Sequence, residues 1–319
     1  MTNKERYAAW ADAIGNVPLT MQPWWMDAVC AGKEWDVLIA EDKKGKILGA
    51  MPYLLRKRHH QRYILMPQMT QTGGIWVDPS ITDNHWEISQ VCKDLQEQLK
   101  ALKISYYYQQ YPIGSVAAKS MESMGFKLRE RKTYRIDFLS DFEQVVASFH
   151  KNKKRQIQKA ATLTADQQLG VEDFYRFHTH CMRAQRKQIL YTREFLLVLQ
   201  RKAARLGQCT ILSIRNMDGE VCAAAFLVWD KTTMYYLIPC YDPAYKDSGA
   251  GALLVLEALK IARQKQLAFD FEGSMDAGTA KHYSQFGSTP TKYYSVEKFY
   301  NPLFRIALWI QKLREWRFR

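Results

Sequence analysis

The chain has 319 residues, of which 47% are hydrophobic and 13% aromatic, which excludes a wholly disordered polypeptide and allows one large domain or two of ordinary size. Its net charge of +14 favours an anionic partner such as nucleic acid, a phosphate-bearing cofactor or an anionic membrane surface. Six cysteines without a C-x-x-C pair predict reduced, packed thiols. With no apolar leader and no long apolar run, the sequence predicts a cytoplasmic protein.

The first part of the chain alternates helical and strand-like patterns. An aromatic region with a helical pattern covers residues 1–34. A hairpin is predicted to follow it, because two apolar runs flank a charged turn that contains Gly45. Apolar residues at helical spacing predict the next helix. The predicted elements are hairpin strands 36–40 and 47–54, a helix over 85–102, and strands 104–110 and 133–138.

From about residue 140 the pattern becomes helical and basic, and then a hairpin returns. Gly207 is placed to end the last of three helices. The predicted elements are helices 142–160, 171–185 and 193–206, and hairpin strands 210–214 and 221–228.

This second hairpin matches the first at one constant offset, which superimposes Gly219 on Gly45. Hairpin, glycine turn, helix, strand, glycine and strand recur in the same order, so the sequence predicts two copies of one α/β unit. We place an N-terminal unit at residues 1–140 and a C-terminal unit at residues 141–319, each with a mixed central sheet flanked by helices.

The stretch 234–273 reads as strand, glycine-bearing turn, helix and strand, which can hold a pyrophosphate at the helix N-terminus. The corresponding turn of the first copy, residues 71–74, precedes Ile75 to Pro79, which cannot open a helix smoothly. We therefore expect the first unit to have lost the cofactor role and to shape the acceptor site.

Several segments resemble the Fem-type transferases. They are Phe149 to Ala160, Gly125-Phe126 with strand 133–138, and Asp270 to Gly273 with Phe286-Gly287. Fem-type proteins are double GNAT-fold enzymes, several of which add amino acids from aminoacyl-tRNA to peptidoglycan precursors, and relatives are acetyl-CoA-type acyltransferases. The chain departs from the family in two ways: Tyr283 stands where many members have lysine, and the long helical hairpin of some members is absent.

The resemblance implies a donor site. GNAT enzymes hold the pyrophosphate of CoA on a [QR]-x-x-G-x-[GA] turn, and Lys246 to Gly251 has this spacing with lysine first. Glycines let the backbone approach phosphates closely. The alternative is a polar strand-to-helix connection with no ligand. The predicted donor-binding residues are Lys246, Ser248, Gly249, Ala250, Gly251 and Ala252.

Acyl transfer to an amine needs a base for the amine and an acid for the leaving group. Strand alternation places Asp270 and Glu272 on one face, where they could bind an ammonium group and take its proton. Tyr241 is the candidate acid, and Tyr283 a weaker one. The competing interpretations are a cap or surface ion pair for the carboxylates and strand packing for Tyr241.

Other patterns predict less. His178 and His180 point to different faces of a helix, so we expect no metal site. The basic run 151–159 is typical of a solvated helix face, although it could contact RNA phosphates. A basic amphipathic stripe from Ile306 to Trp316 fits either peripheral contact with the inner face of a membrane or docking on the protein's own core.

Together these features predict an N-acyltransferase. The donor would be acyl-CoA, such as acetyl-CoA, or aminoacyl-tRNA, and the acceptor a small-molecule or peptide amine such as a cell-wall peptide precursor. We expect tRNA as a partner only if it is the donor, and no DNA. The alternative is a non-catalytic GNAT-fold protein that binds an anion on its basic surface.

Overall fold

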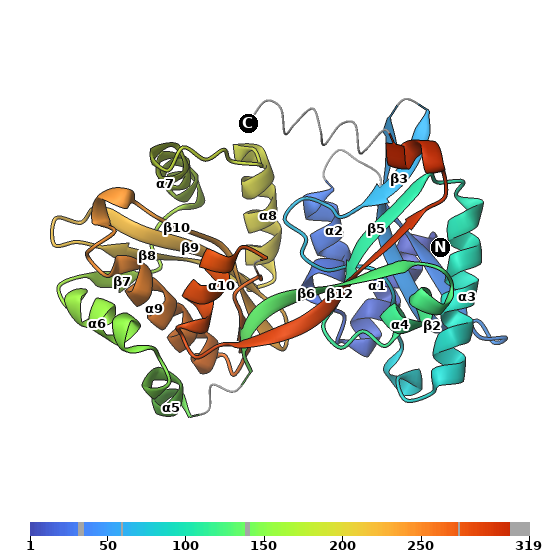
Figure 1. Ribbon diagram of the computed structural model, residues 1–319, viewed down its shortest axis with the longest axis horizontal. Coiled ribbons are helices and arrows are strands. Elements are labelled where there is room, and N and C mark those ends of the chain that lie inside the picture. Colours follow the sequence, from blue (N-terminus) through green and yellow to red (C-terminus); the bar gives the residue numbers. More distant parts are fainter. Residues whose placement is uncertain (31–34, 59, 138–140, 274, 307–319) are drawn as a thin grey trace. The chain divides into compact units, whose positions relative to one another are not determined.

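The computed structural model describes residues 1–30, 35–58, 60–137, 141–273 and 275–306 (Figure 1). Contacts between residues divide the chain into two compact units, Met1–Arg131 together with the chain from Lys292 onward, and Lys132–Thr291. The sequence predicts a single boundary at residue 140, whereas the contacts group residues 292–306 with the beginning of the chain.

The first unit contains a sheet covered by helices. Its strand order is β1-β2-β3-β5-β12, with β4 paired to β2. The strands are β1 (Trp35–Glu41), β2 (Ile47–Arg58), β3 (Gln61–Leu65), β4 (Trp76–Val77), β5 (Tyr106–Tyr111) and β12 (Thr289–Phe299). The helices are α1 (Asn3–Ile14), α2 (Pro23–Val29), α3 (His85–Ala101) and α4 (Ala117–Ser123), with short 3₁₀ turns at Leu19–Met21 and Pro79–Ile81.

The second unit contains the sheet order β6-β11-β10-β9-β8-β7. Its strands are β6 (Lys127–Ile136), β7 (Thr164–Asp166), β8 (Cys209–Arg215), β9 (Val221–Trp229), β10 (Thr233–Tyr241) and β11 (Ala268–Asp270). Its helices are α5 (Phe142–Ala147), α6 (Lys151–Lys159), α7 (Val171–Ala184), α8 (Arg193–Arg205), α9 (Ala250–Gln264) and α10 (Ala277–Ser284), with a 3₁₀ turn at Pro243–Tyr245.

The predicted repeat is present in the folded chain. In each copy two antiparallel hairpin strands lead to a third antiparallel strand, and a helix then connects it to a parallel fourth strand. The first copy uses β1, β2, β3, α3 and β5, and the second uses β8, β9, β10, α9 and β11. Such parallel neighbours need a crossover connection, and the helix supplies it.

The last strand of each copy pairs outside its own copy. Strand β6, which ends the first copy, pairs with β11, and β12, which ends the second copy, pairs with β5. The chain passes from one unit to the other within β6 and returns within β12, which explains the discontinuous first unit.

Some local expectations needed adjustment. The single helix expected over 142–160 is two helices, α5 and α6, and the His150 side chain accepts the Asn152 N–H to begin the second. After Gly74 the chain enters β4 rather than a helix, as expected. A Cβ at Gly74 would lie 2.3 Å from the Tyr111 ring, so packing explains this glycine. The C-terminal stripe lies outside the described residues, apart from Ile306.

Each unit has its own apolar core. In the second unit one face of β8 to β11 packs on α9, and Phe226, Phe269 and Phe271 are fully buried there. No helix among the residues that the structure describes is long and apolar enough to cross a membrane.

Candidate active site

The turn between β10 and α9 begins the candidate donor site. Gly249 caps α9 with φ +85° and ψ 0°, a left-handed conformation that favours glycine. A Cβ at this position would lie 2.0 Å from the Gln156 carbonyl oxygen of α6. The glycine is therefore required by backbone conformation and by the close approach of α6, whether or not a ligand binds.

Gly251 is different, because it has no such neighbour. A Cβ at Gly251 would meet no atom within 4 Å, and the residue is only half-buried in the first turn of α9. Space beside a helix N-terminus is what a phosphate group would need. The exposed Lys246 side chain is three residues before Gly249.

The backbone N–H groups of this turn divide into two sets. The Ala250 N–H donates to Ser248 Oγ at 3.2 Å, and the Ala252 N–H donates to the Gly249 carbonyl at 3.0 Å. Ser248 Oγ in turn donates to the Tyr245 carbonyl at 2.7 Å. Within the described residues, the Gly249 and Gly251 N–H groups have no hydrogen-bond acceptor. Of the six predicted donor-binding residues, these two glycines retain free backbone donors.

Strands β10 and β11 stay paired only briefly. Their parallel register ends at the pair Tyr235↔Asp270, whereas β10 continues to Tyr241. Beyond this point β10 has no partner on that edge among the described residues. The chain after Asp270 turns at Glu272 and Gly273, both with positive φ. The carboxylates thus lie where the two strands separate.

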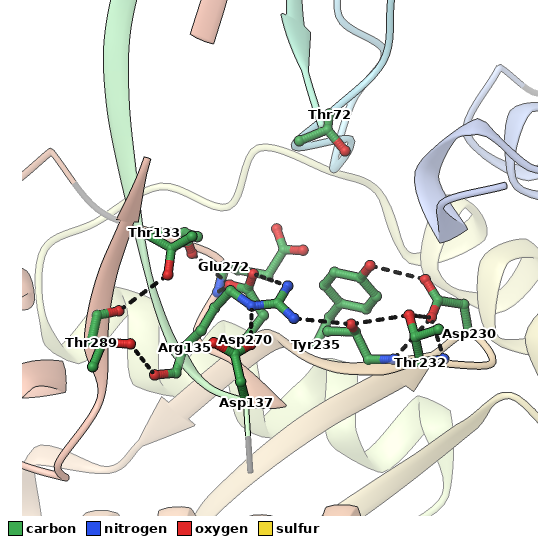
Figure 2. Close-up of polar contacts among 12 residues, drawn as sticks. Thr72, Thr133, Arg135, Asp137, Asp230, Thr232, Tyr235, Asp270, Glu272 and Thr289 are labelled. Atoms are coloured by element: carbon green, nitrogen blue, oxygen red, sulfur yellow. Dashed lines mark hydrogen bonds and ion pairs between the residues drawn. The ribbon is translucent and has the colours of Figure 1, made fainter. Parts of the chain in front are cut away.

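Asp270 is held by a buried network (Figure 2). Its Oδ1 atom accepts hydrogen bonds from Thr133 Oγ1 at 2.5 Å and from the Glu272 N–H at 2.8 Å. Its Oδ2 atom lies 3.4 Å from Arg135 Nη1, because the register of β6 and β11 places Arg135 opposite Asp270. Asp270 is 1% exposed, and burial raises the pKa of its carboxyl against the opposing effects of Thr133 and Arg135. Both oxygens are therefore engaged inside the protein.

Glu272 has a different environment. Its side chain points away from the Asp270 contacts in Figure 2, and within the described part of the chain no hydrogen bond reaches its carboxylate. The residue is half-buried, and its φ of +62° is rare for a side chain of this kind. Burial raises the pKa of this carboxyl well above its usual value, and the negative charge of Asp270 adds to the effect. A carboxylate with a raised pKa is a stronger proton acceptor than an ordinary one.

The two candidate tyrosines differ in position. Tyr241 ends β10, six residues past the last pair with β11, which corresponds to about 20 Å along a strand. Tyr283 on α10 instead stacks on Phe271 with ring centroids 4.6 Å apart. Burial, followed by the charges of Glu272 and Asp270, raises the Tyr283 pKa to about 12. Sequence reasoning ranked Tyr241 first because it could not see that α10 folds back over the strand end.

One buried cation was missed altogether. Lys153 of α6 is 4% exposed, and its Nζ atom lies 3.1 Å from His282 Nδ1 and 5.0 Å from the centroid of the Phe286 ring. Burial lowers the pKa of this lysine. No sequence pattern distinguishes Lys153, because it belongs to a run of basic residues that otherwise face solvent.

The histidines near α7 have structural partners. His178 Nδ1 accepts a hydrogen bond from Tyr191 Oη at 2.6 Å, and His180 Nε2 lies 3.0 Å from Asp242 Oδ2. Among the described residues, no group of three or more His, Cys, Asp or Glu side chains could hold a metal ion.

Residues 127–283 match the acetyltransferase (GNAT) domain family. Residues 127–283 are thus an acyltransferase domain of the GNAT type, and the whole chain has the fold of two tandem GNAT-like units. No curated protein matches it in sequence.

Several solved structures have a fold similar to that of the whole chain. The crystal structure of FemX aligns with a TM-score of 0.74 at 13% identity, over 96% of this chain and 98% of FemX. A tandem GNAT protein from the clavulanic acid biosynthesis pathway has a TM-score of 0.59 at 10% identity, over 95% of this chain and 98% of that one. L-PGS from Bacillus licheniformis has a TM-score of 0.56 at 11% identity, over 97% and 96% of the two chains. The resemblance to Fem-like double-GNAT proteins is confirmed.

Proposed function

We propose that this protein transfers an acyl group from acyl-CoA to an amine, with Glu272 as the base. The observation that carries the proposal is the Glu272 carboxylate, which is half-buried, has a raised pKa and has no hydrogen-bond partner among the described residues where β10 and β11 separate. Asp270, whose two oxygens are engaged by neighbours, would position Glu272 through its N–H.

The proposed reaction needs one side chain that accepts a proton and one that donates a proton. An acceptor ammonium group loses a proton to Glu272, and the resulting amine attacks the thioester carbonyl carbon. A C–N bond forms, the C–S bond breaks, and the leaving thiolate takes a proton from a tyrosine. The nitrogen loses its second proton to the tyrosinate, which leaves a neutral amide and restores the phenol. We favour Tyr283 as the acid because its ring stacks on Phe271, the residue next to Glu272, and its phenol is protonated at neutral pH. Tyr241, farther along β10, remains the second candidate.

We place the donor phosphates at the start of α9. The free Gly249 and Gly251 N–H groups, the open space at Gly251 and the exposed Lys246 favour an anionic group there. Acyl-CoA is the donor we favour, because the matched family is one of acetyltransferases. Aminoacyl-tRNA is the other donor, and a cell-wall peptide amine is the acceptor to try first because several segments of the sequence resemble the Fem-type transferases.

Donor binding is tested by thermal unfolding with acetyl-CoA. A ligand at 100 times its Kd stabilises the folded state by about 2.7 kcal/mol, so the unfolding temperature should rise clearly. Gly251→Val should remove this rise, because its side chain fills the open space without strain on the backbone.

The matched control is Gly170→Val at the start of α7, where a Cβ meets only ordinary contacts and φ is −65°. This variant should keep the full response to acetyl-CoA. An unchanged response of Gly251→Val would mean that the donor does not bind at this turn. Stabilisation by charged tRNA but not by acetyl-CoA would assign the other donor.

A further inference from the structure

A pocket of about 820 Å³ lies in the first unit, and none of its lining residues belongs to the second. It is formed by the beginning of β6, the end of β12 and the residues that follow β12. The lining residues that matter here are Lys127, Arg129, Lys298, Phe299, Arg305 and Ile306.

The charge of this pocket is strongly unbalanced. Four cationic side chains line it, and the one carboxylate among its lining residues is that of Glu297. That carboxylate already accepts a hydrogen bond from Tyr106 Oη at 2.8 Å, and its Oε2 atom lies 3.6 Å from Arg129 Nε. Lys127 and Arg305 are exposed, and neither pairs with an acidic side chain among the described residues. An anionic ligand would balance them.

Exposed aliphatic side chains stand beside these cations. Leu303 is 71% exposed and Ile306 is 54% exposed. The segment that carries them is held by Phe304, whose ring lies 5.4 Å from the Tyr63 ring and 5.8 Å from the Tyr106 ring, measured between centroids. Because Phe304 is fixed inward, Leu303, Arg305 and Ile306 are presented to solvent together.

We propose that Lys127, Arg129, Leu303, Arg305 and Ile306 form a docking surface for anionic phospholipids at a membrane surface. Phosphate headgroups would lie against the cations of the pocket, and the two aliphatic side chains would enter the boundary between headgroups and acyl chains. A soluble phosphate would balance the charge but leave Leu303 and Ile306 in water, whereas a lipid surface accounts for both features. This docking surface is independent of the proposed acyl transfer, because its residues belong to the other unit.

The test is co-sedimentation of the full chain with vesicles of phosphatidylglycerol in phosphatidylcholine, compared with phosphatidylcholine alone. The wild-type protein should bind only the anionic vesicles and should be released by salt. Lys127→Glu combined with Arg305→Glu should weaken binding by at least about tenfold, since each basic residue near an anionic surface contributes appreciably. Leu303→Ser should also weaken binding, at unchanged net charge.

The matched control is Lys43→Glu combined with Lys93→Glu, which makes the same charge change at exposed residues of the first unit that do not line the pocket. This control should keep most of the binding. Equal losses in the two double variants would overturn the proposal in favour of a general effect of net charge. Binding of soluble glycerol phosphate that is lost in Lys127→Glu with Arg305→Glu, without any binding to vesicles, would overturn it in favour of a small-molecule site.

Discussion

Asp270 and Glu272 are neighbours on one strand end, yet they have different surroundings. Asp270 is engaged by Thr133, Arg135 and a backbone N–H, whereas the Glu272 carboxylate has no hydrogen-bond partner among the described residues. Strand alternation predicts that the two share a face, but it does not say which of them is covered. Because of their different surroundings, we expect replacement of Glu272 to change activity and replacement of Asp270 to change stability.

Replacing Glu272 should affect chemistry rather than folding. Glu272→Gln keeps the size of the side chain and removes the proton acceptor, so we expect kcat to fall by about 10²- to 10⁴-fold, with the acetyl-CoA response of the unfolding temperature retained. Because its raised pKa keeps Glu272 protonated to higher pH than an ordinary carboxylate, activity of the wild type should rise with pH through that pKa. Steady-state rates across pH measure both effects, and near-wild-type turnover of Glu272→Gln would remove it from the mechanism.

Replacing Asp270 should affect folding. Asp270→Ala leaves Arg135 without its buried partner and Thr133 without its acceptor, at a cost of about 3 kcal/mol. Urea unfolding measures the loss. A variant as stable as the wild type would show that the network contributes little.

His178 should make the protein sensitive to acid. Burial lowers its pKa from 6.5 to about 4, so between these values the unfolded chain binds a proton that the folded chain does not. Stability is therefore complete above about pH 6.5 and declines as the pH falls toward 4, by up to roughly 3 kcal/mol. His178→Gln, which still offers Tyr191 an acceptor, should flatten this decline in urea unfolding at pH 7 and pH 5, whereas His85→Gln at an exposed site should not.

At the scale of elements, the start of α9 combines two glycines with different roles. Gly249 allows α6 to approach and has a left-handed backbone, while Gly251 is beside open space. The sequence motif predicts the same ligand-binding role for both glycines. Only the packing of α6 against this turn separates them.

The corresponding alanine variants should diverge in stability. Gly249→Ala places a methyl group against the Gln156 carbonyl at positive φ and should cost about 2 kcal/mol or more. Gly251→Ala meets nothing and should leave stability unchanged or slightly raised, because alanine favours the helix. Thermal unfolding without ligand compares the two, and equal stabilities would contradict the close approach of α6.

At the scale of the whole molecule, the two copies exchange their final strands. Strand β12 completes the first sheet by pairing with β5 over Tyr294↔Tyr111 to Phe299↔Tyr106. A fragment that ends at residue 140 therefore contains the first sequence copy but lacks the strand that pairs with β5. It also exposes β5, which is a site for aggregation.

We expect the fragment 1–140 not to fold as an independent unit. Circular dichroism on heating should show no cooperative transition for it, in contrast to the full chain. A fragment that combines residues 1–131 with residues 292–319 through a short linker keeps β12 and is the matched control. A cooperative transition in the fragment 1–140 would show that β12 is dispensable.

The sequence by itself determined the two-copy α/β organisation, because hydrophobic periodicity and turn residues are local and recur in both halves. It also predicted the candidate donor turn and the candidate pair Asp270 and Glu272, since these predictions follow from residue types at strand ends. The tertiary structure decided which carboxylate is free, that Tyr283 lies beside it, and that Lys153 is buried, because these depend on contacts between distant segments. The exchange of β6 and β12 was likewise beyond the sequence, since strand alternation specifies which face is buried but not which strand lies alongside.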